Sequence, residues 1–169
     1  MKNLLVGALA LSVVVAIPCY ANANPALDFI LSSSQQDMPT RTNDTRKGET
    51  PRLLAEARRS LGQGHRALGV GGSLWCAEAV NVWLSRSGLK PVDSRLARDM
   101  IKAGTRVSAP QPGAIAIFRR GRAGGHVAVV DQVEAGGYTA VSPNYGGRVA
   151  LAHYRNGSAI AFVIPRSRG

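Results

Sequence analysis

Two runs rich in valine, isoleucine and alanine stand close together within residues 114–133, AIAIFRRGRAGGHVAVVDQV. The runs cover 114–118 and 126–133, and the glycine-rich segment 119–125 between them is short enough to form a β-hairpin. Three more runs of the same kind follow, at 138–142, 149–154 and 160–164. This pattern predicts an antiparallel β-sheet of about five strands.

Upstream of residue 110 the apolar residues recur at helical spacing instead. Three helices are predicted: one from Pro51 that stops at Gly62, one that Ser73 caps and that runs to Gly88, and one that starts at Asp93 or Ser94 and ends at Gly104. Helices followed by an antiparallel sheet give an α+β domain.

The first 23 residues are typical of a cleavable secretory signal. Lys2 precedes an apolar run at 4–17, and small residues follow up to Ala23, the expected cleavage point. The run is shorter than the roughly 18 apolar residues of a membrane span, so no stable span is expected after cleavage. Cleavage after Ala21 and an uncleaved anchor remain open. The signal predicts a periplasmic or secreted bacterial protein.

Two further parts are expected after the signal. Residues 24–50 are polar and lack a sustained apolar period, which predicts a flexible linker. Residues 51–169 have a globular composition and are numerous enough for one compact domain.

Signal cleavage also removes Cys19, so Cys76 is the single cysteine of the exported product. A lone cysteine in an oxidising compartment is either buried and inert or a nucleophile. Cys76 falls in the first turn of the second predicted helix, where N–H groups and the helix dipole favour a thiolate. Such a position can lower a thiol pKa from about 8.5 to about 3.5 to 7.5. The same N–H groups can stabilise an oxyanion.

His126 and Asn144 are the partners expected for Cys76. His126 begins a predicted strand directly after Gly124 and Gly125, which let backbone and substrate approach closely. Asn144 lies in the connection after the next strand. Cysteine, histidine and then an amide at successive element ends is the order of a cysteine triad. A structural histidine and an ordinary turn asparagine are the alternatives.

Four motifs carry a family resemblance: Trp75 to Val80 (WCAEAV), 94–98 (SRLAR), 112–118 (PGAIAIF) and 124–130 (GGHVAVV). Together and in this order they resemble the NlpC/P60 and CHAP superfamily of papain-like peptidoglycan hydrolases, over about residues 51–165. The resemblance implies a papain-like fold with the nucleophile at a helix start. This sequence departs from the usual pattern in its short, glycine-rich segment 62–72, which leads up to the cysteine.

The resemblance also implies a mechanism. Cys76 would attack an amide carbonyl, His126 would accept its proton and later protonate the leaving amine, and Asn144 would orient the imidazole ring. Gly124 and Gly125 would lie against the substrate, and Trp75 would either line a subsite or pack beneath the helix start. No metal or other cofactor is implied. The substrate would be an amide bond of bacterial peptidoglycan, within the wall peptide or between peptide and muramic acid.

The formal net charge of +11 at pH 7 predicts attraction to polyanions. Basic motifs interleaved with aromatic residues are absent, so nucleic acid is not an expected partner. For an exported chain, the expected partners are peptidoglycan and other anionic envelope polymers. A catalytically inactive wall-binding or scaffold protein and a secreted bacteriolytic effector remain open as alternative functions.

Overall fold

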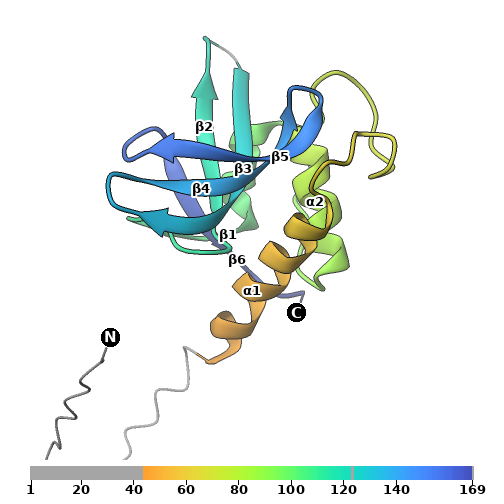
Figure 1. The fold of residues 1–169 in the computed structure, drawn as a ribbon. Coiled ribbons are helices and arrows are strands. Elements are labelled where there is room, and N and C mark those ends of the chain that lie inside the picture. The colour runs from red at the N-terminus through yellow and green to blue at the C-terminus, as the bar shows by residue number, and fades with distance from the viewer. Residues whose placement is uncertain (1–43, 123, 169) are drawn as a thin grey trace, which may run out of the picture. The chain divides into compact units, whose positions relative to one another are not determined.

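The computed structural model describes residues 44–122 and 124–168, so the predicted signal peptide and most of the predicted linker lie outside it (Figure 1). Within these residues, three helical segments precede the sheet: α1 (Asp44–Arg59), α2 (Cys76–Arg86) and the 3₁₀ helix η1 (Ala97–Ala103). The strands are β1 (Gly104–Val107), β2 (Ile115–Arg120), β3 (Gly124–Glu134), β4 (Gly137–Tyr145), β5 (Arg148–Arg155) and β6 (Ala161–Pro165). None of the described helices is both long and apolar enough to cross a membrane.

The sheet has the strand order β1-β6-β2-β3-β4-β5, and every neighbouring pair is antiparallel. The expected α+β class is confirmed, with helix α2 beginning at Cys76. The sheet has one strand more than predicted. Strand β1 is only four residues long and is not buried, so it shows none of the apolar alternation that identifies a strand in a sequence.

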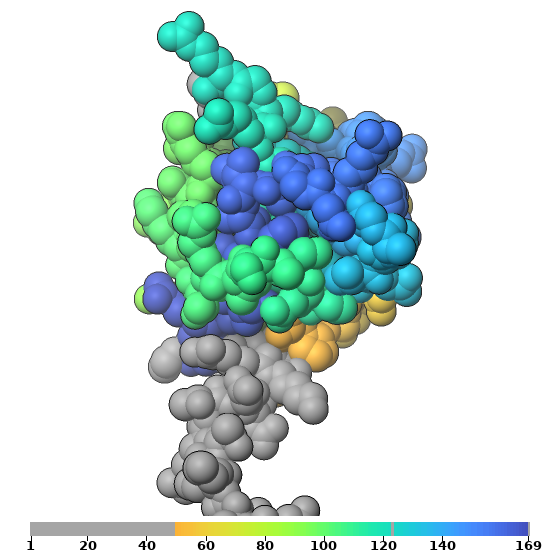
Figure 2. All heavy atoms as spheres, turned by 90° about the vertical axis from the view of Figure 1, so that its left-hand side faces the viewer, coloured from red at the N-terminus to blue at the C-terminus, as the bar shows by residue number. Residues whose placement is uncertain are grey.

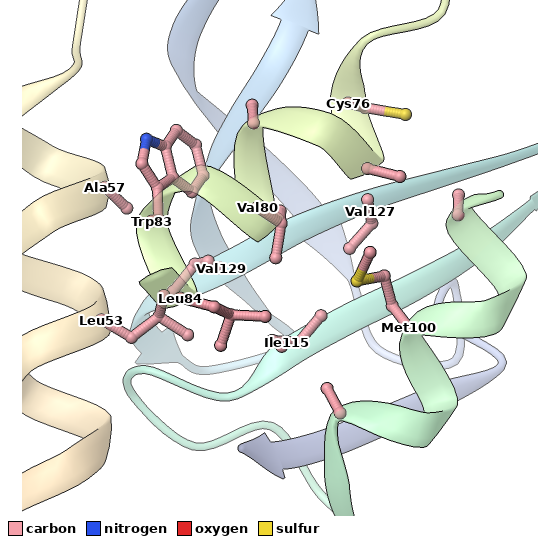
Figure 3. Close-up of a cluster of buried hydrophobic side chains, with 14 of the residues drawn as sticks. Leu53, Ala57, Cys76, Val80, Trp83, Leu84, Met100, Ile115, Val127 and Val129 are labelled. Carbon is pink, nitrogen blue, oxygen red and sulfur yellow. The ribbon is translucent and has the colours of Figure 1, made fainter. Parts of the chain in front are cut away.

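One face of the sheet packs against the helices. Figure 3 shows side chains from α1, α2, η1, β2 and β3 meeting in one buried cluster. Its largest fully buried members include Trp83, Leu53, Leu84, Met100 and Ile115. A smaller cluster, which includes Phe118, Tyr138 and Phe162, lies on the other face of the strands.

Several polar contacts join α1 and the residues after it to the rest of the domain, including the following two. Arg58 pairs with Asp131 of β3 at 2.5 Å, and the indole N–H of Trp83 donates to Ser60 Oγ at 2.9 Å. Burying the Trp83 indole without an acceptor would cost free energy, so Ser60 makes this close packing of α1 on α2 possible.

Helix boundaries differ from the prediction at three places. Helix α1 begins at Asp44, so Pro51 lies inside it and not in its first turn. Helix α2 begins only at Cys76, so its N-cap is Trp75 and not Ser73, and no side chain caps it. The third predicted helix is a 3₁₀ helix that starts only at Ala97.

Candidate active site

Cys76 is the first residue of α2, and its side chain is 7% exposed. The start of the helix is anchored in the core because the neighbouring Trp75 and Ala77 are buried. Figure 3 shows the sulfur at the margin of the buried cluster, pointing away from Trp83 and Leu84. The thiol lines a surface cleft, so it is held by the core and still faces solvent.

Opposing effects act on the pKa of the Cys76 thiol. Burial raises this pKa, while the backbone N–H groups of Val127, Ala77 and Cys76 itself, together with the charge of Arg120, lower it. Burial is the largest effect, and the net result is a raised pKa. The expectation of a lowered thiol pKa from the helix start alone is therefore wrong. At neutral pH the group rests as a thiol.

His126 lies near the start of β3, opposite Phe118 of β2, and only 4% of it is exposed. Its ring centroid is 5.8 Å from that of Phe118. Burial, with a smaller contribution from the charge of Arg120, lowers the pKa of His126 from 6.5 to about 4. The imidazole is therefore neutral at neutral pH and can accept a proton. Because the N–H of the next residue, Val127, acts on the thiol, this part of β3 lies directly against Cys76.

A pair of hydroxyl groups holds the His126 ring. Ser142 Oγ of β4 lies 2.8 Å from His126 Nε2 and 2.9 Å from the hydroxyl of Tyr154 on β5. Ser142 is fully buried, and Tyr154 stacks on Phe118 with centroids 4.4 Å apart. A hydroxyl can both accept and donate, so Ser142 can accept from Nε2–H. That tautomer leaves Nδ1 with a lone pair for a proton.

Asn144 has a different contact from the one expected. Its Nδ2 donates to the carbonyl of Ser73 at 2.8 Å, and its φ of 58° is the left-handed conformation that asparagine tolerates better than most residues. It therefore joins β4 to the segment just before Cys76. Among the described residues, the side chain that hydrogen-bonds to the imidazole is Ser142.

The remaining residues expected at the site divide into two groups. Trp75 is 2% exposed, and its ring lies 6.3 Å from that of His65, so it packs beneath the helix start and does not line a subsite. Gly124 and Gly125 do line the cleft. A side chain at Gly124 would lie 2.5 Å from the carbonyl oxygen of Arg120, so the tight hairpin requires glycine there.

The cleft runs from the nucleophile to the β2–β3 hairpin. Its lining residues are Leu74, Cys76, Arg95, Leu96, Ala97, Arg98, Arg120, Gly124 and Gly125. Glu78 anchors one side of the cleft, because it forms an ion pair with Arg95 and accepts the N–H of Gly71 at 3.2 Å. The other two histidines lie elsewhere, His65 beside Trp75 and His153 on the surface near Glu134, at 3.5 Å.

The low pKa of His126 predicts a loss of stability in acid. Between pH 6.5 and about 4 the unfolded chain protonates this histidine while the folded chain does not, so falling pH favours unfolding. We expect the free energy of unfolding to fall by up to about 3 kcal/mol over this window and to level off below it. Denaturant titrations at pH 7, 5.5 and 4 measure the loss. For the variant His126→Gln, the fall in the free energy of unfolding should be smaller by that amount. Equal falls in both proteins would contradict a buried neutral imidazole.

Comparison with protein families matches residues 68–144 to the CHAP domain. This range contains Cys76, His126, Ser142 and Asn144, and the match confirms the resemblance drawn from the motifs. No curated protein matches the chain.

Proposed function

Because this chain carries a CHAP domain, we propose that it is an exported cysteine hydrolase that cleaves an amide bond of bacterial peptidoglycan. CHAP domains are typically peptidoglycan amidases or peptidases. The observation that carries the proposal is a cleft-lining thiol at a helix start, held against the backbone of Val127, the residue that directly follows the buried, neutral His126.

The ionisation of the pair supports general-base activation of the nucleophile. A thiol with a raised pKa is a poor nucleophile until a base removes its proton, and neutral His126 is available as that base. As the proton moves to His126, the sulfur attacks the amide carbonyl carbon. The N–H groups of Val127 and Ala77, which already favour negative charge on the sulfur, stabilise the thiolate as it forms.

The remaining steps follow from the same groups. Negative charge moves to the carbonyl oxygen, where N–H groups of the first turn of α2 stabilise it. Protonated His126 gives its proton to the leaving amine, and an acyl group remains on Cys76. His126 then takes a proton from water as the water oxygen attacks the thioester carbonyl, the acyl group leaves as a carboxylic acid, and protonated His126 returns its proton to the Cys76 sulfur.

Ser142 has a positioning role in this mechanism, and we expect Ser142→Ala to lower kcat about tenfold with KM unchanged. The variant removes one hydrogen bond that orients the ring, and its loss should raise the activation free energy by about 1.4 kcal/mol. Tyr154→Phe should have a smaller effect, because Ser142 keeps its contact with the imidazole. Steady-state kinetics on a soluble wall fragment gives both parameters. The control is Ser158→Ala, an exposed serine that bonds to the Arg155 carbonyl. A change in KM alone would contradict the role.

Mass spectrometry of fragments released from purified peptidoglycan tests the proposed reaction. New amino and carboxyl termini identify the bond, and their position separates an endopeptidase from an amidase that cuts at muramic acid. Release by the parent protein and none by Cys76→Ala is the expected result. Wall binding without release would instead indicate an inactive wall-binding protein, which the low exposure and raised pKa of Cys76 favour as the second candidate.

Export is part of the proposal and has its own test. The apolar run at 4–17 followed by Ala21 and Ala23 supports cleavage after Ala23. The mass of the protein recovered from the periplasm or medium of a producing bacterium should correspond to a chain that begins at Asn24. Recovery of the intact chain from the membrane fraction would indicate an uncleaved anchor. Killing of other bacteria by the purified protein would mark it as a bacteriolytic effector.

A further inference from the structure

We propose that the cleft beside Cys76 selects a peptide with a free carboxylate near the scissile amide, which Arg98 and Arg120 bind. The inference rests on the proposed hydrolysis and adds a substrate class to it. It comes from three features of the cleft: the charge of its lining, the placement of the two arginines, and the apolar surface beside them.

All the charged residues that line the cleft are basic. The lining contains three arginines and no acidic residue. Arg95 is already paired with Glu78. Across residues 44–122 and 124–168, the ion pairs include neither Arg98 nor Arg120. Two guanidinium groups in the cleft therefore remain open to an anionic ligand.

The two arginines come from opposite walls. Arg120 ends β2, at the hairpin that Figure 2 shows projecting from the domain in teal, and Arg98 follows the start of η1. Gly125 lets these walls approach: a side chain there would meet Ala97 Cβ at 3.2 Å and the backbone nitrogen of Arg98 at 3.6 Å. The geometry thus places both basic residues around one narrow opening.

Arg120 is also near the reacting groups. Its charge lowers the pKa values of Cys76, His126 and Tyr154, which requires the guanidinium to lie within electrostatic range of all three. Arg98 has a more remote role, because its charge acts instead on the neighbouring carboxylate Asp99, which pairs with Lys102 at 3.5 Å. A carboxylate bound by both arginines would therefore lie close to the amide that Cys76 attacks.

Apolar surface accompanies the charge. Leu74 is 73% exposed and Leu96 is 50% exposed, and both line the cleft. Such exposure leaves them free to contact small apolar side chains of a peptide. Guanidinium groups suit the planar carboxylate, with which they form paired, charge-assisted hydrogen bonds. The combination fits an acidic peptide with small apolar residues better than a neutral glycan, which carries no carboxylate.

The test compares purified peptidoglycan peptides with the same peptides after carbodiimide coupling to ammonia, which converts their carboxylates to primary amides. We expect the parent protein to have a kcat/KM about tenfold higher on the untreated peptides. Arg98→Gln should abolish this preference by raising KM, with little change in kcat. Arg120→Gln should raise KM and also lower kcat, because Arg120 acts on Cys76 and His126.

Arg119→Gln is the matched control. Arg119 is exposed, adjacent to Arg120 and not part of the cleft lining. The variant removes the same charge as the other two, but it should keep the preference for untreated peptides. Equal loss in Arg98→Gln and Arg119→Gln would show that only net charge matters and would overturn the subsite. Equal cleavage of both peptide sets by the parent protein would overturn it as well.

Binding separates this inference from the proposed reaction. The Cys76→Ala protein should bind the untreated peptides about tenfold more tightly than the amidated ones in calorimetry, and adding Arg98→Gln should remove the difference. If the parent protein cleaves neither set, the proposed reaction fails, while this binding preference still decides the subsite. If it cleaves them but binding shows no preference, the subsite alone is wrong.

Discussion

Replacing Cys76 with alanine should abolish hydrolysis of peptidoglycan and leave a folded protein. The variant removes the only atom that can form the acyl intermediate, so the expected loss is complete within detection. The thiol lies at the margin of the core, and deleting one buried sulfur should reduce the free energy of unfolding by no more than about 2 kcal/mol. Fragment release and thermal unfolding are measured on the same preparations.

Cys76→Ser is the companion variant, because it keeps nearly the full side-chain volume and removes the sulfur. Undiminished turnover in either variant would exclude Cys76 as the nucleophile. A collapse of thermal stability in both, with little change in the activity per folded molecule, would instead identify a structural cysteine.

Replacing His126 should be nearly as damaging, with at least a hundredfold loss of kcat/KM, since the proposed mechanism gives this neutral imidazole the role of general base. His126→Gln is preferred to His126→Ala, because an amide can keep a hydrogen bond to Ser142 and fills most of the buried space. Steady-state rates are compared with unfolding curves for both variants.

Two histidines serve as internal controls for this result. His65→Ala and His153→Ala should retain activity within a few-fold, because His65 lies beside Trp75 and His153 lies on the surface near Glu134. If either variant is more damaging than His126→Gln, the base has been assigned to the wrong residue.

Local sequence pattern was sufficient for the parts of the fold that local interactions determine. The hairpin between β2 and β3 and the position of Cys76 at a helix start follow from alternation, glycines and helical spacing. Strand β1 could not be predicted, because its backbone pairs with β6 about sixty residues later while its side chains carry no apolar signal. Ser73 does not cap α2, because the helix begins only at Cys76 with Trp75 as its N-cap.

For the candidate site, the sequence predicts residues but not the contacts between them. The motifs identify Cys76 and His126, but the choice between Ser142 and Asn144 depends on the register of β4 and on a bulge between Ser142 and Tyr145. A polar residue ending the apolar run at 138–142 was the available signal. Tyr154 lies beside Ser142 only because β5 pairs with β4, and no local sequence pattern predicts this contact. The thiol pKa was missed because burial depends on the packing of the whole domain.

The uncharged nature of the Ser142 and Tyr154 pair has a consequence for how the His126 ring responds to pH. A serine hydroxyl does not ionise near neutral pH, and burial raises the pKa of Tyr154 above its usual value of 10.0. The groups that hold the ring therefore keep the same charge from mildly acidic to mildly alkaline surroundings, whereas a carboxylate in that place would change its charge in acid. The acid sensitivity of this part of the fold accordingly comes from His126 itself and not from its hydroxyl partners.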